Sequence, residues 1–308
     1  MRCRELEPGE EERLLDLLDG WPFRDGRRGK DFFRRYLEDD PAYEPRNVLV
    51  AENGGELISC VQIFPRIVRT ATGPRSCGGI GSVFTRPAHR RSGTASELLR
   101  FAISAMRSRG MALSLLVAGP IGLYTRLGWR ELDGSEVLVE ADRRELGLLG
   151  IGRPLADAGD LERVAEIAAF YSEHRLGTVV RDEISWRASL RLAGDPDEEL
   201  VVAGPGRGVE AYLRLAALDG AWRALEWGCA SNQHGLLAEL MISHSRGALV
   251  LPTIHDEVLE SELRAHGAGL RARQGDGTWM LRGVTMSQSE ATAALPVERF
   301  AFWPADRF

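Results

Sequence analysis

The sequence is poor in lysine: Lys30 is the only one, and arginine supplies the other basic side chains. Acidic residues outnumber basic ones, 45 against 39, and no basic stretch is interleaved with aromatic residues, which argues against a nucleic-acid partner. No apolar run approaches the roughly 18 residues that a membrane span requires. Residues 1–20 are rich in acidic side chains and contain no apolar region of the kind found in signal peptides. We therefore expect a cytoplasmic protein with neither a nucleic-acid nor a membrane partner.

Cysteine and histidine are also sparse. The four cysteines form no C-x-x-C pair, and the six histidines form no H-x-x-x-H pair. Neither a metal site nor a disulfide framework is therefore expected, and scattered cysteines suit a reducing compartment. The nucleophile elbow G-x-S-x-G and the P-loop are both missing. The sequence thus offers none of the chemistries that these motifs define.

The first half of the chain contains a strand–turn–helix–strand unit. At 308 residues, with 44% hydrophobic and 27% charged residues, the chain is long enough for two globular domains. Residues 79–85 form an apolar run between glycines and Pro87, which predicts a strand. After Gly93, apolar residues at helical spacing predict a helix that ends near Arg109. The apolar run 112–118 then predicts a buried strand parallel to the first.

The turn before the predicted helix, His89-Arg90-Arg91-Ser92-Gly93, is basic and contains a glycine. Backbone N–H groups at a helix start, together with the positive end of the helix dipole, favour a phosphate group. A dinucleotide-binding turn is a different interpretation of Gly79-x-Gly81. Phe84 stands where its third glycine would be, so we discard that interpretation.

Three motifs in this region resemble the GNAT superfamily of N-acetyltransferases. Arg90-x-x-Gly93-x-Ala95 is similar to the acyl-CoA pyrophosphate signature Q/R-x-x-G-x-G/A. Val83 begins a V-x-x-x-P-x-x-R run, and Tyr124 begins a segment that resembles the superfamily's Y-x-x-x-G-F ending. The resemblance implies an α/β fold of the α+β type with a mixed sheet, acetyl-CoA as co-substrate, and an amine as acceptor.

The resemblance also implies roles for individual residues. The strand backbone at residues 83–85 would bind the pantetheine amides like an added strand and so orient the thioester. Tyr124, whose phenol is protonated at neutral pH, would be the general acid that protonates the departing thiolate. The residues implied in cofactor binding are Val83, Phe84, Thr85, Arg90, Arg91, Ser92, Gly93, Thr94, Ala95, Ser96 and Gly119.

From about residue 152 the chain repeats the pattern of its first half. The run 48–51 is echoed by the run 200–203, an offset of 152 residues that the following strand keeps. Such a repeat predicts two copies of one domain. The second copy has Asn232-Gln233-His234-Gly235 in place of the arginine-bearing turn, and no tyrosine where Tyr124 would map. We expect it to keep the fold without binding the cofactor.

An active first domain followed by a degenerate second one resembles the bacterial enhanced intracellular survival (Eis) branch of the superfamily. We expect a catalytic domain at 1–145, a degenerate GNAT-like domain at 152–283 and a C-terminal tail at 284–308. Eis proteins carry a third, sterol-carrier-like domain, for which this chain is too short. In Eis-like enzymes the terminal carboxylate reaches the active site beside the tyrosine, which implies that the tail folds back and that Phe308 supplies the catalytic base.

Alternatives remain for the base, the tail and the activity. Glu52 and Glu56 are other candidate bases, because a terminal carboxylate of pKa about 3.5 is a weak base unless burial raises its pKa. The tail aromatics, Phe300, Phe302, Trp303 and Phe308, could serve only as a staple buried against both domains. The predicted function is acetyl-CoA-dependent N-acetylation of a primary amine on a small molecule or peptide; the alternative is a non-catalytic acyl-CoA-binding or regulatory protein. The acceptor and any homo-oligomer stay open.

Overall fold

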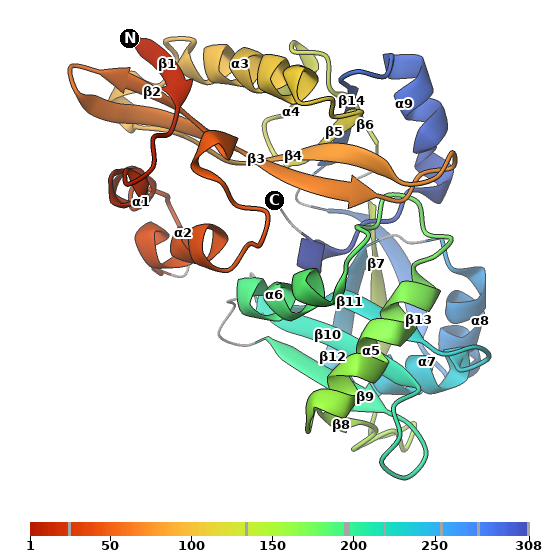
Figure 1. The fold of residues 1–308 in the computed structure, drawn as a ribbon. Helices are drawn as coiled ribbons and strands as arrows, with labels where there is room; N and C mark the ends of the chain where they lie inside the picture. The colour runs from red at the N-terminus through yellow and green to blue at the C-terminus, as the bar shows by residue number, and fades with distance from the viewer. Residues whose placement is uncertain are drawn as a thin grey trace.

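The structure, a computed structural model, describes residues 1–23, 26–132, 135–193, 198–218, 220–252, 255–275 and 278–306. Their strands form two mixed sheets of seven strands each, one above the other in Figure 1. The mixed α/β fold class expected from the sequence is confirmed.

The strands and α-helices from β1 to β7 recur in the same order from β8 to β14. The first half contains β1 (Arg2–Glu5), α1 (Glu11–Leu18), α2 (Gly29–Glu38), η1 (Pro45–Asn47), β2 (Val48–Asn53), β3 (Glu56–Val68), β4 (Arg75–Thr85), η2 (Pro87–His89), α3 (Thr94–Ser108), β5 (Leu113–Ala118), α4 (Ile121–Thr125), β6 (Arg130–Glu131) and β7 (Ser135–Ala141). The second half contains β8 (Arg153–Pro154), α5 (Ala158–Tyr171), α6 (Glu183–Ala193), β9 (Glu199–Ala203), β10 (Ala211–Leu218), β11 (Ala221–Cys229), α7 (His234–His244), β12 (Gly247–Pro252), α8 (Glu257–Ala265), β13 (Gly269–Gln274), β14 (Thr278–Gly283), α9 (Gln288–Ala294), η3 (Val297–Arg299) and η4 (Pro304–Asp306).

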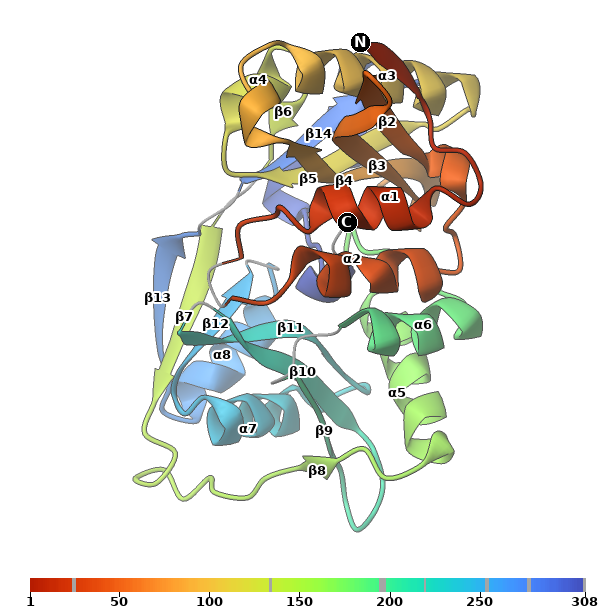
Figure 2. The ribbon, with the colours of Figure 1, turned by 90° about the vertical axis from the view of Figure 1, so that its left-hand side faces the viewer.

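The first sheet, in the order β1-β2-β3-β4-β5-β14-β6, carries helices on both faces (Figure 2). On β2, Val48 and Val50 pack with α1 and α2, whereas Leu49 and Ala51 pack with α3. Successive side chains of a strand point to opposite faces, and a strand covered on both faces is therefore continuously apolar. The helix expected after Gly93 is α3, and the predicted parallel pairing of β4 with β5 is confirmed.

The second sheet, in the order β13-β7-β12-β11-β10-β9-β8, repeats this arrangement with the same strand register. Val202 pairs with Tyr212 between β9 and β10, just as Val50 pairs with Cys60 between β2 and β3. Both members of the pair are shifted by the 152 residues that the sequence repeat predicts. The two hairpins are therefore equivalent in structure as well as in sequence.

One strand of each half lies in the sheet of the other half. β7 pairs with β12 and β13 in the second sheet, and β14 pairs with β5 and β6 in the first. The contiguous boundaries expected at 1–145 and 152–283 are corrected in this respect, since 135–141 belongs to the second sheet and 278–283 to the first. Each exchanged strand has a partner on both sides, so backbone hydrogen bonds join the halves.

Residues 300–303 of the tail are buried between the halves. Phe300 and Phe302 pack in a cluster with residues of β4, β5 and β14, whereas Ala301 and Trp303 pack in the core of the second half. The three aromatic side chains are at most 2% exposed. The expected burial against both domains is confirmed for these three residues, and the fourth, Phe308, lies outside the described residues. The alternation of the three follows the two-residue period of an extended chain.

Candidate functional site

β4 and β5 diverge after a short paired stretch. Their parallel pairing runs from Cys77–Leu113 to Gly79–Leu115, although β4 continues to Thr85. Beyond the pairing Ser82 has a φ of 50°, and the register between β4 and β3 shifts nearby. An irregularity of this kind bends a strand and ends its pairing. The second half of β4 therefore turns its edge away from β5.

The diverging end of β4 carries three of the expected cofactor residues. The carbonyl of Phe84 points toward β3, where it accepts a hydrogen bond of 2.7 Å from the Ser59 hydroxyl. Successive carbonyls of a strand point to opposite edges, so those of Val83 and Thr85 point toward the β5 side. The Thr85 carbonyl accepts a hydrogen bond from the Arg90 Nε at 3.0 Å.

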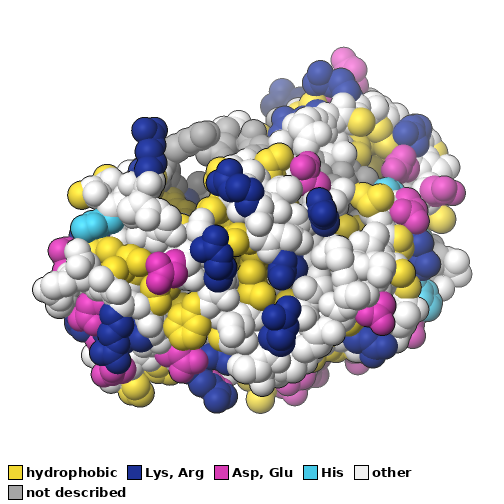
Figure 3. All heavy atoms as spheres, turned by 90° about the horizontal axis from the view of Figure 1, so that it is seen from above, with side chains coloured by type: hydrophobic (Ala, Val, Ile, Leu, Met, Phe, Trp, Pro, Cys, Tyr) yellow, Lys and Arg dark blue, Asp and Glu magenta, His cyan; other side chains and the backbone are white. Residues whose placement is uncertain are grey.

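The basic turn leads directly into α3. Gly93 precedes the helix with a φ of 85°, a left-handed conformation that glycine adopts without strain. The first backbone hydrogen bond of the helix runs from the Glu97 N–H to the Gly93 carbonyl at 3.0 Å. The N–H groups of residues 94–96 come before it and, as in the first turn of any α-helix, have no acceptor within the helix. The Arg90 and Arg91 side chains are exposed at this end, and Figure 3 shows basic side chains gathered on the face that α3 covers. The arrangement suits an anion.

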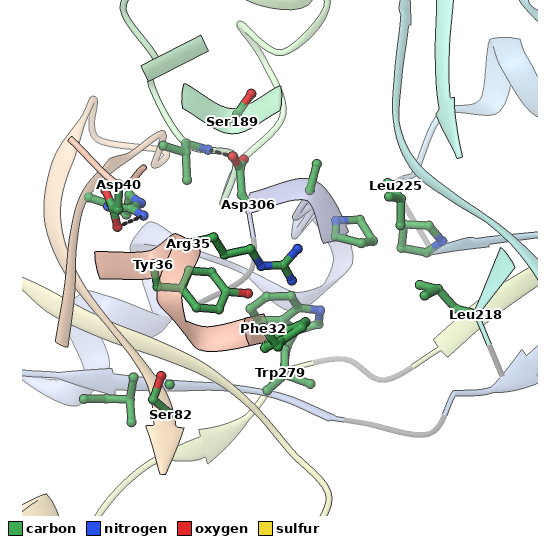
Figure 4. Close-up of a pocket in the computed structure, with 18 of the residues that line it drawn as sticks. Phe32, Arg35, Tyr36, Asp40, Ser82, Ser189, Leu218, Leu225, Trp279 and Asp306 are labelled. Atoms are coloured by element: carbon green, nitrogen blue, oxygen red, sulfur yellow. Dashed lines mark hydrogen bonds and ion pairs between the residues drawn. The ribbon is translucent and has the colours of Figure 1, made fainter. Parts of the chain in front are cut away.

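A cavity of about 2000 Å³ takes its walls from both halves of the molecule (Figure 4). Among the expected site residues it is lined by Val83, Gly119 and Tyr124. Phe84 and Thr85 lie outside the lining, as do the turn and helix residues Arg90, Arg91, Ser92, Gly93, Thr94, Ala95 and Ser96. The expected site is therefore split into an interior part at the diverging strands and an exterior part at the start of α3.

Tyr124 lies on the short helix α4 and is 7% exposed. Its ring and that of Trp129 pack in a T-shaped arrangement, with 6.1 Å between ring centroids. Burial disfavours a phenolate and raises the pKa of Tyr124 to about 12. The phenol therefore keeps its proton at neutral pH, as a general acid must before it acts.

The structure does not bring the alternative bases to the cavity. Glu52 is paired with Arg4 at 3.1 Å and Arg13 at 3.3 Å, and Glu56 is paired with Arg86 at 3.1 Å. Neither glutamate lines the cavity. Phe308, the first choice from the sequence, lies outside the described residues.

A buried ionic group holds the tail at the cavity and was missed by sequence reasoning. Arg181 donates from Nε to Asp306 at 2.7 Å, and from Nη1 to both carboxylate oxygens of Glu226 at 2.8 and 2.9 Å. These three side chains are at most 6% exposed. A buried charge that loses its partner is strongly destabilising, so the group fixes the position of the tail. In the sequence, Asp306 is only an aspartate within an aromatic-rich tail, and no pattern indicates its partners Arg181 and Glu226.

The corresponding cleft of the second half is filled by side chains. β11 and β12 are paired at only two positions. Tyr171 of α5 and Trp303 of the tail stack with 6.5 Å between ring centroids, and both belong to the buried core of this half. Tyr171 packs on Gly228 near the end of β11, so closely that a Cβ added at Gly228 would lie 3.2 Å from the Cβ of Tyr171.

The start of α7 also differs in charge from the start of α3. His234, its first residue, lies 3.9 Å from the Asp256 carboxylate, measured from Nε2 to Oδ2. Asp256 accepts hydrogen bonds from Tyr171 and from Arg175. A carboxylate beside a helix start opposes the binding of a phosphate there.

Residues 2–132 match the family model of the GNAT acetyltransferase domain. The fold is that of two GNAT-like domains in tandem. It resembles GCN5-related N-acetyltransferases from Kribbella flavida (19% identity, TM-score 0.67) and Anabaena variabilis (16%, 0.66), each over 92% of this chain and 72% of that one. Eis1 from Mycobacterium abscessus is similar over 92% of this chain and 74% of its own, with 20% identity and a TM-score of 0.61. A search of curated proteins finds no significant match.

The residues that the structure describes contain no cluster of three or more histidine, cysteine, aspartate or glutamate side chains that could hold a metal ion. None of the helices in the described ranges has both the length and the hydropathy of a membrane span.

Proposed function

We propose that this protein is an acetyl-CoA-dependent N-acetyltransferase that transfers the acetyl group directly to a primary amine. The observation that carries the proposal is that Val83, on the diverging edge of β4, and Tyr124 line one cavity. A pantetheine arm bound along that edge would direct its thioester toward Tyr124. The match of residues 2–132 to the GNAT domain supports this reaction class. The likeness to Eis1 supports a place in the tandem, Eis-like branch.

The proposed reaction forms one C–N bond and breaks one C–S bond. The amine nitrogen attacks the carbonyl carbon of the thioester and gives up a proton to the base. Tyr124 donates its phenolic proton to the departing thiolate, and the phenolate is then reprotonated from solvent. General acid assistance of this kind is typically worth about 10²–10⁴ in rate.

The terminal carboxylate of Phe308 is the proposed base. Asp306, two residues earlier, lines the cavity and is held there by Arg181. Two residues extend a chain by at most about 7 Å. This short reach supports a tail that delivers its carboxylate into the cavity, and the ion pairs of Glu52 and Glu56 disfavour the alternatives.

Acetyl-CoA should bind once per chain, at the start of α3. Gly93→Asp should weaken acetyl-CoA binding by more than tenfold, because it places a negative charge where the pyrophosphate binds. Isothermal calorimetry would give both the stoichiometry and the dissociation constant. Two sites per chain would contradict a second half that has lost the cofactor.

Gly93→Asn is the matched control for that experiment. Asparagine and aspartate have the same shape and both tolerate the left-handed conformation of this position. An added Cβ meets no atom within 4 Å at Gly93, so neither variant is excluded by space. Equal losses of affinity in the two variants would mean that backbone strain, rather than charge, is responsible.

The pH dependence of kcat should show no alkaline decline below about pH 10, if Tyr124 is the acid. Burial raises its pKa to about 12, so its proton is present at all lower pH values and is lost only as the pH rises through the pKa. The measurement is kcat at saturating substrates from pH 7 to 10, with thermal melts at each pH. A decline centred near pH 8 in a protein that stays folded would point to a different acid.

The decisive test of the function is a screen of amines for acetyl-CoA-dependent release of free thiol. We expect at least one amine class to give turnover. Saturable acetyl-CoA binding without turnover on any amine would favour the alternative, a non-catalytic acyl-CoA-binding or regulatory protein.

A further inference from the structure

Four aromatic side chains line one side of the cavity. We call them the aromatic wall: Trp21 and Phe23, which follow α1, and Phe32 and Tyr36 of α2. Neighbouring rings of the wall contact one another, with centroid distances of 6.3 Å for Trp21–Phe23, 4.7 Å for Phe23–Phe32 and 5.7 Å for Phe32–Tyr36. Aromatic side chains each offer a large apolar area. The wall can therefore hold the apolar body of a ligand.

The aromatic wall adjoins the edge of β4 along which the pantetheine arm is proposed to bind. The ring of Trp21 contacts the ring of Phe84, with 5.9 Å between the two centroids. Phe84 is the chain neighbour of Val83, the β4 residue that lines the cavity near its end. A ligand held against the wall is therefore close to the proposed path of the thioester.

Apolar side chains also face the cavity from other elements. Figure 4 shows Trp279 of β14, and Leu218 and Leu225 of β10 and β11, around the same cavity as the aromatic wall. Val117 also lines the cavity, pairs with Trp279 between β5 and β14, and is 47% exposed. A large apolar side chain that stays exposed in a cavity offers a surface to an apolar ligand. Both halves of the molecule therefore contribute to an apolar lining.

The acidic side chains of the lining are already engaged. The described lining residues include five acids, and four of them are in ion pairs with lining arginines: Asp40–Arg66, Glu136–Arg223, Glu198–Arg214 and Asp306–Arg181. The fifth, Asp182, accepts a hydrogen bond of 2.8 Å from the Ser185 N–H at the start of α6. A second ammonium group on the acceptor would have to compete with these arginines for a carboxylate. The ion pairs therefore favour an acceptor whose body is uncharged.

We propose that the acceptor is an arylalkyl monoamine, a primary amine on an aromatic body that carries no second charge. The aromatic wall holds the ring of the acceptor, and the amino group reaches the thioester beside β4. The cavity of about 2000 Å³ exceeds the roughly 300–1,000 Å³ of ordinary small-molecule pockets, so a bulky ring system has room beside a pantetheine arm. This inference rests on the proposed acetyl transfer and names the chemical class of its acceptor.

The test compares two pairs of amines, and the members of each pair differ in one group. 4-Phenylbutylamine and n-butylamine differ in the ring, and heptylamine and 1,6-diaminohexane differ in a terminal methyl or ammonium group. We expect kcat/KM to be at least about tenfold higher for 4-phenylbutylamine, because burial of a phenyl ring is worth a factor of this size or more. Heptylamine should also be favoured at least about tenfold, because a second ammonium group would lose its hydration in the cavity. An equal or reversed preference in either pair overturns the inference.

Phe32→Ser removes one ring of the aromatic wall and should lower the preference for 4-phenylbutylamine over n-butylamine at least about threefold, whatever its effect on either rate. Leu218→Asn keeps the approximate size of its side chain but makes it polar, and it should lower the same ratio even if Phe32→Ser does not fold. Phe170→Ser is the matched control, because Phe170 is 57% exposed on α5 and does not line the cavity. It should keep both rates and their ratio. An unchanged ratio in the folded variants at positions 32 and 218 overturns the inference.

A binding experiment separates this inference from the proposed function. Calorimetry measures the four amines with the wild type and the three variants in the presence of CoA, which has no acetyl group to transfer. If no amine is acetylated but 4-phenylbutylamine binds more tightly than n-butylamine and loses that advantage in Phe32→Ser, the proposed function fails and the ligand class is supported. If amines are acetylated without preference for the aromatic member, the proposed function stands and this inference fails. A wild type that neither binds nor acetylates 4-phenylbutylamine also overturns the inference.

Discussion

Tyr124→Phe should lower kcat by about two orders of magnitude or more, because it removes the phenolic proton that general acid catalysis supplies. The variant keeps the ring and its contact with Trp129, so the fold and the affinity for acetyl-CoA should be unchanged. The measurements are steady-state thiol release for kcat and calorimetry for the dissociation constant of acetyl-CoA.

The matched control is Tyr171→Phe in the second half. Tyr171 is also buried, and its hydroxyl donates to Asp256, but it does not line the cavity. This variant should keep kcat and lose about 1–3 kcal/mol of stability, since it leaves a buried carboxylate short of a hydrogen bond. A decrease of less than tenfold in kcat for Tyr124→Phe would reduce that residue to a packing role.

Two glycines added after Phe308 should cause kcat to collapse while the melting temperature stays unchanged. The extension moves the terminal carboxylate by up to about 7 Å and leaves the tail aromatics and the Arg181–Asp306 pair in place. A tail that acts only as a staple would keep both activity and stability, since Phe300, Phe302 and Trp303 are untouched. Activity assays and thermal melts on the same preparations distinguish the two roles.

Phe308→Ala is the corresponding control. It removes the ring but keeps a carboxylate at the same distance along the chain, so a catalytic carboxylate should retain most of its activity. Full activity in the extended protein would rule out the terminal carboxylate as the base. Loss of activity in Phe308→Ala alone would instead assign the role of this residue to its ring.

Local patterns were sufficient to predict much of this molecule. The strand before Pro87, the helix after Gly93 and the parallel strand after it follow from periodicity and turn residues that lie close together in the chain. The repeat offset of 152 residues also predicted the register of the second hairpin, where Val202 pairs with Tyr212. Register follows from which side chains are buried, and that information is present in the sequence.

The contacts between the halves could not be predicted in the same way. The apolar pattern of residues 135–141 indicates a strand but does not indicate the sheet to which it belongs. Its backbone hydrogen bonds would be the same in either sheet, and both sheets have an equivalent position for this strand. Tyr171 and Trp303 fill the second cleft together although they are 132 residues apart in the chain. The cavity likewise brings α2 together with β10 and β11, and no local sequence pattern predicts that these elements line the same space.

The exchange of β7 and β14 bears on why a copy without a cofactor site would persist. In oligomers, exchange of an identical element between subunits joins them as a domain swap, and here the same interlocking occurs inside one chain. A gene that lost its second half would encode a first sheet without β14, in which β5 becomes an open edge. Open apolar edges promote aggregation. A second half that binds no cofactor, as we propose, could therefore be retained by selection for solubility alone.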